Sequence, residues 1–249
     1  MSPTHLTPWL AGLATAAALG AAALPSHALT LIGHDLSQPV VPYAWDAVPA
    51  TDIKWTATYD IRKAVGVTLA SGSSYRFDSF TAMLAMVTSD GSDYLKTEQV
   101  HAAIFRDDSG RPGALLADLG TLTLTPLQPI LSPFAAQPTT WAAATPVLLQ
   151  GGSTYWFALN DASQYSEFGI PLAHWTIMAS GSATVPTGAE TLAGYRITSD
   201  GGVNWNPSGF YNAMQIDVTA VPEPQTLAML LAGLGVPGAV AWRRRSAGA

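Results

Sequence analysis

The chain contains no cysteine and little charge. None of its 249 residues is a cysteine and only 11% are charged, whereas 48% are hydrophobic. The absence of thiols excludes disulfides, thiol nucleophiles and cysteine metal sites. The hydrophobic content excludes a disordered chain, because a composition of this kind buries a core. The fold must therefore be held together by its hydrophobic core.

Basic residues are scarce between the two ends of the chain. Residues 29–221 hold 8 basic and 16 acidic residues, so this segment carries a net charge of −8, compared with −6 for the whole chain. An acidic surface repels phosphate backbones, which disfavours nucleic-acid binding, so we expect no nucleic acid as a partner. The length of the segment suits one domain.

The N-terminal region has the form of a secretory signal peptide. An uncharged run rich in alanine and leucine, residues 10–24, is followed by Pro25-Ser26-His27-Ala28. Small residues at the first and third positions before a cut are typical of signal cleavage. We expect residues 1–28 to be a helical signal peptide and cleavage to separate Ala28 from Leu29.

The C-terminal region is apolar and ends in a basic cluster. Leu227 to Trp242 would span about 24 Å as a helix, which is short for a hydrocarbon layer of about 30 Å. The cluster Arg243-Arg244-Arg245 should remain cytoplasmic and leave the domain outside. We expect a short transmembrane helix that holds the protein transiently; a permanent anchor is the alternative.

This tail resembles a known sorting signal. Pro222-Glu223-Pro224, then an apolar segment, then the arginine cluster, is similar to the PEP-CTERM motif. The resemblance assigns residues 221–249 to sorting and implies processing by an exosortase of a Gram-negative bacterium. It further implies transfer to the cell surface or to the exopolysaccharide matrix.

Short apolar runs separated by turn residues fill the segment 29–220, and no window has a convincing helical period. The pattern predicts an all-β domain, a two-sheet antiparallel β-sandwich with jelly-roll-like character. The expected strands are 29–33, 64–69, 75–88, 99–105, 115–125, 145–149, 154–160, 173–179, 195–198 and 212–218.

The same segment resembles the choice-of-anchor domains, most closely the R type. The resemblance is carried by IFRDDSGRPG at 104–113, by LLQGGSTYWFAL at 148–159, and by Asp200-Gly201-Gly202 with Trp205. It implies an extracellular β-rich domain and supplies no catalytic residue.

Catalytic and metal-binding patterns are weak. No Gly-x-Ser-x-Gly elbow is present, and the histidines of the domain have no zinc spacing. The Asp-rich turns are solvated in the simplest interpretation; as oxygen ligands they are also candidates for Ca²⁺, at Asp90, Asp93, Asp107 and Asp108. We expect no cofactor. The stretch 198–205 is expected to form a single hairpin.

Loop tryptophans are the remaining candidates for binding. Trp45, Trp141 and Trp205 lie in Pro/Gly-rich sequence and are the best candidates to stack on sugars. The sequence therefore predicts a non-enzymatic, structural or adhesive surface or matrix protein. One alternative is a carbohydrate-binding module that uses these tryptophans on exopolysaccharide; a secreted hydrolase with paired carboxylates is the less favoured one.

Overall fold

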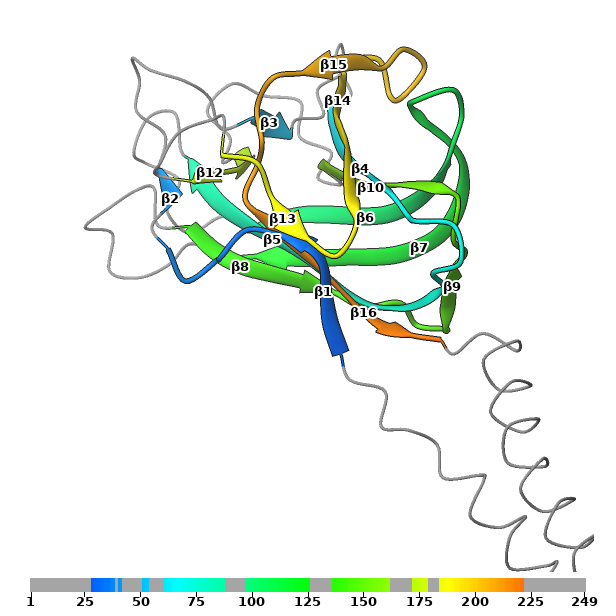
Figure 1. Cartoon of the computed structure of the whole chain (residues 1–249). Coiled ribbons are helices and arrows are strands. Elements are labelled where there is room, and N and C mark those ends of the chain that lie inside the picture. Colours follow the sequence, from blue (N-terminus) through cyan, green and yellow to red (C-terminus); the bar gives the residue numbers. More distant parts are fainter. Residues whose placement is uncertain are drawn as a thin grey trace, which may run out of the picture. The chain divides into compact units, whose positions relative to one another are not determined.

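The computed structural model describes residues 28–38, 40–41, 51–53, 61–87, 97–125, 136–161, 172–178 and 184–221. All regular elements in this part of the chain are β-strands (Figure 1). They belong to one compact unit that runs from Ala28 to Ala220. The predicted signal helix and the predicted C-terminal helix lie outside the described residues.

The first sheet is antiparallel and contains eight strands. These are β1 (Ala28–Gly33), β3 (Thr51–Ile53), β5 (Tyr75–Val87), β8 (Ala136–Trp141), β9 (Val147–Leu149), β11 (Leu172–Trp175), β13 (Thr187–Gly188) and β16 (Met214–Ala220). Their order is β13-β1-β16-β5-β11-β3, and β8 and β9 both pair with β5.

The second sheet is also antiparallel and contains six strands. These are β4 (Arg62–Thr68), β6 (Glu98–Asp107), β7 (Pro112–Leu124), β10 (Thr154–Asp161), β14 (Thr191–Thr198) and β15 (Asn206–Ser208). Their order is β15-β14-β4-β10-β6-β7, which makes β7 an edge strand. A two-stranded sheet pairs β12 (Ile177–Met178) with β2 (Val40–Val41).

The core lies between the two large sheets. Phe80 of the first sheet packs against Phe157 of the second with ring centroids 5.7 Å apart, and against Trp175 at 5.8 Å. Trp175 in turn contacts Tyr195 of the second sheet at 6.1 Å. Each of these rings is at most 1% exposed. The predicted two-sheet antiparallel sandwich is confirmed.

β5 is covered on both faces, as its continuous apolar sequence predicts. Phe80, Ala82 and Leu84 are fully buried toward the core. On the opposite face Met83, which is 7% exposed, packs with Met178 of β12 and with Ala213. The small β2-β12 sheet supplies part of this cover, since Met178 pairs with Val40.

The two ends of the domain are neighbours in one sheet. β1 and β16 are antiparallel, and their register begins with Ala28 opposite Thr219. β16 also pairs with β5 on its other side. Leu29, the expected first residue of the mature chain, is already part of β1, so loss of residues 1–28 would shorten this strand by only one residue.

Every strand run expected from the sequence overlaps a strand of the structure, but several strands were missed. The missed strands are short, apart from β8: they are β2, β3, β8, β12 as a strand separate from β11, β13 and β15. β8 has the sequence AQPTTW, and Pro138 within it favoured a loop assignment. The proline is tolerated because β8 pairs with β5 alone among the described strands, which makes it an edge strand.

Candidate functional site

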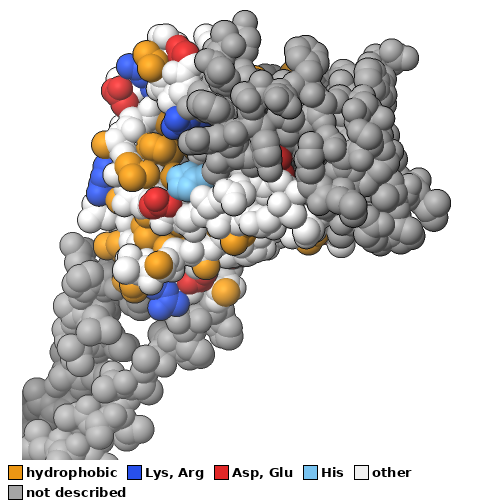
Figure 2. Space-filling view, turned by 180° about the vertical axis from the view of Figure 1, so that it is seen from behind, with side chains coloured by type: hydrophobic (Ala, Val, Ile, Leu, Met, Phe, Trp, Pro, Cys, Tyr) orange, Lys and Arg blue, Asp and Glu red, His pale blue; other side chains and the backbone are white. Residues whose placement is uncertain are grey.

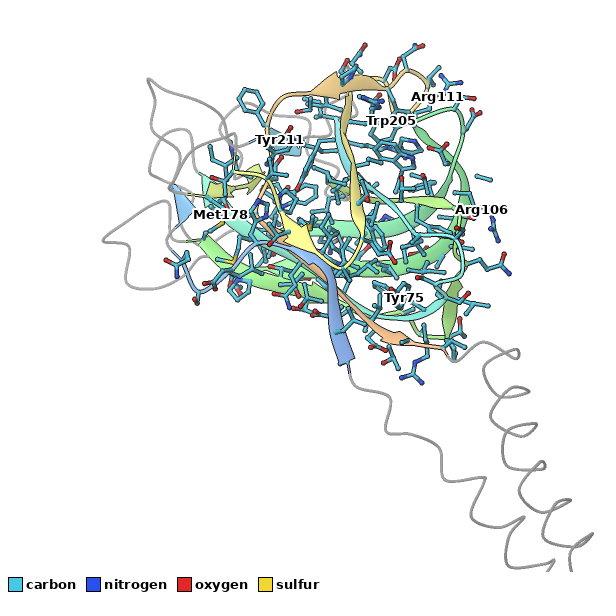
Figure 3. All side chains as sticks on the ribbon, viewed as in Figure 1. Tyr75, Arg106, Arg111, Met178, Trp205 and Tyr211 are labelled. Atoms are coloured by element: carbon cyan, nitrogen blue, oxygen red, sulfur yellow. The ribbon has the colours of Figure 1, made fainter. Side chains whose placement is uncertain are left out.

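A cleft lies where an edge of one sheet approaches an edge of the other. It is lined by the end of β6, the middle of β7, the loop that follows β8, and β9, and its volume is about 520 Å³. In Figure 1, β7 and β9 lie on the same side of the domain, and Figure 3 places Arg106 on that side. The lining residues that the argument uses are Arg106, Leu116, Asp118, Thr145, Leu148 and Gln150.

Asp118 of β7 is held in place by its neighbours. Its Oδ1 accepts hydrogen bonds from the backbone N–H of Gly120 at 2.7 Å and from Nε2 of His101 at 2.8 Å. The other ring nitrogen of His101, Nδ1, lies 3.0 Å from Oδ1 of Asn160. The Gly120 N–H, followed by His101, lowers the pKa of Asp118 below its usual value, so the carboxylate stays ionised. Figure 2 shows a histidine beside an acidic side chain, with hydrophobic side chains around them.

The remaining polar side chains of the cleft are not used within the domain. Among the described residues, Arg106, Thr145 and the side chain of Gln150 make no hydrogen bond or ion pair, and Oδ2 of Asp118 accepts none. Arg106 is exposed, and Leu148 beside it is 49% exposed. The cleft thus offers donors, acceptors and apolar surface to solvent.

No local sequence pattern predicts this cleft. Arg106 and Asp118 come from β6 and β7, and Gln150 directly follows β9; no local sequence pattern around them predicts a shared cleft. Only the pairing of β6 with β7, and the approach of β9 to that edge, brings them together.

The three tryptophans predicted to stack on sugars differ in their burial and in whether the structure describes them. Trp45 lies outside the described residues. Trp141 is 1% exposed: it is the last residue of β8, points into the core and stacks on Phe80 with centroids 6.0 Å apart. The expected loop exposure of Trp141 is therefore wrong, because the segment is an edge strand. Trp205 is half-buried and packs beside Trp156 in a small cluster on the second sheet.

The carboxylates of the Asp107-Asp108 turn form hydrogen bonds and an ion pair within the domain. Asp107 accepts the indole N–H of Trp156 at 2.7 Å and the backbone N–H of Gly110, while Asp108 pairs with Arg111 at 3.2 Å. Asp90 and Asp93 lie outside the described residues. Within the described ranges, no group of three or more metal-ligating side chains occurs.

The stretch 198–205 forms the expected hairpin between β14 and β15. Asp200 closes it: its Oδ1 accepts from the Thr198 hydroxyl at 2.6 Å and from the Asn204 backbone N–H at 2.9 Å. The N–H of Asn204, with the Thr198 hydroxyl second, lowers the pKa of Asp200 to about 2. Gly201 and Gly202 have φ of 72° and 94°, which the tight turn requires.

One buried amine was not anticipated. Lys63 of β4 is fully buried, and its Nζ donates to the carbonyl of Phe210 at 3.2 Å. The same Nζ lies 5.6 Å from the ring centroids of Tyr195 and Phe210. Burial lowers the pKa of Lys63 to about 7, because the charged form is poorly solvated there.

The domain is followed directly by the tail. β16 ends at Ala220, and the structure describes one residue beyond it, Val221. No helix in the ranges described has the length and apolar character needed to cross a membrane. The expected transmembrane segment falls in residues 222–249, which are outside those ranges.

The architecture defines an all-β sandwich domain that is continuous with a C-terminal tail. Comparison with known families places that tail: the PEP-CTERM protein-sorting motif matches residues 220–245. The match supports the assignment of Pro222-Glu223-Pro224 and of the arginine cluster to a sorting motif, and it indicates an exported, membrane-sorted protein. No curated protein matches the chain.

Proposed function

We propose that this chain is a surface or matrix protein of a Gram-negative bacterium, released from a transient membrane tether by an exosortase. The observation that carries the proposal is the sorting motif at 220–245, which begins at the last residue of β16. A motif placed there can be cut without opening the sandwich, because β16, the last strand of the described residues, ends at Ala220. The segment 29–220 is proposed to be a choice-of-anchor domain.

The role proposed for the domain is structural or adhesive and non-enzymatic. Two of its histidines are engaged within the fold. The nitrogens of His101 face Asn160 and Asp118, and those of His34 face the carbonyl of Thr184 and the N–H of Met214. A general base needs a free ring nitrogen within reach of substrate, so this engagement favours a scaffold role for both rings.

The intact mass of the protein recovered from the cell surface, the medium and the membrane tests this proposal. We expect one species that starts at Leu29 and ends close to Pro222-Glu223-Pro224, with or without an added group. A matched variant, Glu223→Ala, should shift the protein to the membrane fraction with its arginine cluster intact. Recovery of the unaltered chain only with Arg243-Arg244-Arg245 still attached would show a permanent anchor and refute processing.

A further inference from the structure

We propose that the cleft between β7 and β9 binds a short stretch of a neutral saccharide chain. This inference names the ligand class for the proposed adhesive role, and it rests on that proposed function. It uses a different site from the loop tryptophans expected from the sequence, since Trp141 is buried and no aromatic side chain in the described part of the chain lines the cleft.

The first support is the set of unused polar groups. Sugar hydroxyls act both as donors and as acceptors, so a saccharide site needs both kinds of partner. Arg106 supplies donors only, Oδ2 of Asp118 accepts only, and Gln150 and Thr145 do both. All of these groups line one cavity, and within the described chain their polar atoms have no competing partner.

The second support is the fixed position of the carboxylate. The chain of contacts from Asn160 through His101 to Asp118, completed by Gly120, orients Oδ1 and leaves Oδ2 for a ligand. A group that is already ordered loses little conformational entropy when it binds. This arrangement suits recognition of a sugar hydroxyl by Oδ2 of Asp118.

The third support is the apolar surface beside these groups. Leu116, Pro146, Val147 and Leu148 contribute carbon atoms to the wall of the cleft. Leu148 is 49% exposed, although it belongs to a strand, so its side chain is available to cover the C–H face of a sugar ring. The volume of about 520 Å³ lies in the usual range for small-ligand clefts, about 300–1,000 Å³.

Charge favours a neutral saccharide over an acidic one. Among the described residues, Arg106 is the one basic side chain that lines the cleft, and ionised Asp118 faces the same space. The segment 29–221 as a whole carries a net charge of −8. A uronate-rich chain would therefore meet a repulsive field and only one cation to offset it.

The shape of the β7 edge disfavours a peptide strand as the ligand. Addition of a strand requires a regular edge, but the register of β6 and β7 shifts at Ala102/Ala103, Ile104/Phe105 and Phe105/Asp107. Gly120 in β7 adds a backbone φ of 87°. Bulges of this kind twist an edge and prevent pairing, so the free edge is closed to strands while its cleft remains open.

The test uses the protein purified from the producing cells, with whichever C-terminus it carries. The probes are cellohexaose, xylohexaose, mannohexaose, laminarihexaose and chitohexaose, with hexagalacturonate as the charged comparison, in titration calorimetry. We expect binding of at least one neutral probe. Arg106→Ala and Asp118→Asn should each weaken it about tenfold or more, because each removes a charge-assisted hydrogen bond.

The matched control is Arg111→Ala, which removes an exposed arginine that pairs with Asp108 and does not line the cleft. This variant should bind like the wild type, and circular dichroism should show all variants folded. The proposal is overturned if no neutral probe binds, if only hexagalacturonate binds, or if binding survives both cleft substitutions. It is also overturned if a strand-forming Val-Thr peptide binds at the β7 edge with the same affinity in the wild type and in Arg106→Ala. The intact mass separately reports whether tail processing has failed.

Discussion

Replacement of Gly66 by alanine tests how the second sheet is packed on its outer face. Gly66 lies in β4 directly below the indole of Trp156, which is fully buried. A Cβ at this position would lie 2.7 Å from Cζ3, 2.8 Å from Cη2 and 2.9 Å from Cε3 of that ring. Real Cβ atoms essentially never approach another heavy atom to less than 3.0 Å, so the indole must move.

The ring has little room for that movement. Its Nε1–H donates to Oδ1 of Asp107 at 2.7 Å, and the guanidinium carbon of Arg196 lies 5.5 Å from the ring centroid. Overpacking alone costs about 1–3 kcal/mol, and loss of a hydrogen bond to a charged group costs about 1.5–3 kcal/mol. Both losses arise from one displacement, so we expect Gly66→Ala to lower the free energy of unfolding by about 2–4 kcal/mol.

Equilibrium unfolding in urea, followed by circular dichroism, measures this change. Gly209→Ala is the matched control, because a Cβ at Gly209 meets nothing within 4 Å and its φ is not in the left-handed region. We expect the control to change the free energy of unfolding by less than about 0.5 kcal/mol. Equal stabilities of the two variants would refute the packing argument. In a Trp156→Leu background, which lacks the indole, the Gly66→Ala substitution should lower the free energy of unfolding by less than it does in the wild type.

Two further predictions concern pH. The folded pKa of Asp200, about 2, lies below the usual value of 3.8, so its stabilisation is complete above about pH 4 and is lost as the pH falls toward 2. In acid titrations, Asp200→Asn should therefore differ most from the wild type near neutral pH, and a constant difference would contradict this. The folded pKa of Lys63, about 7, lies below the usual 10.5, so the unfolded chain binds more protons between these values and stability should rise with pH there. Urea unfolding at pH 7, 8 and 9 should show this rise in the wild type and a weaker one in Lys63→Met; identical slopes would show that Lys63 is not the cause.

The sandwich was predictable because its strands carry their own pattern. β16 alternates between buried Met214, Ile216 and Val218 and more exposed Gln215 and Asp217, a period that one face of a sheet requires. The edge strand β8 was missed for the opposite reason. Its burial does alternate, since Thr139 and Trp141 point inward, but Pro138 directly before Thr139 hides the period.

The cleft could not be predicted, for a physical reason. Its polar residues sit on exposed positions, where local sequence patterns do not distinguish a ligand contact from an ordinary solvated side chain. Arg106 and Gln150 are 44 positions apart and meet only through the order of the strands in two sheets. The sorting tail is the contrasting case: its signal lies in three consecutive short blocks, so the sequence alone identifies it.

The pairing of β1 with β16 determines how the domain bears a mechanical load. In a chain retained through its C-terminal end, tension enters the sandwich at Ala220 and runs along β16. β16 is hydrogen-bonded to β1 on one side and to β5 on the other, and these bonds lie perpendicular to the strand. A pull along its axis loads both ladders in shear, so their bonds must yield together instead of opening one at a time like a zipper. In a chain retained in this way, the two neighbouring strands would share the tensile load that enters at Ala220.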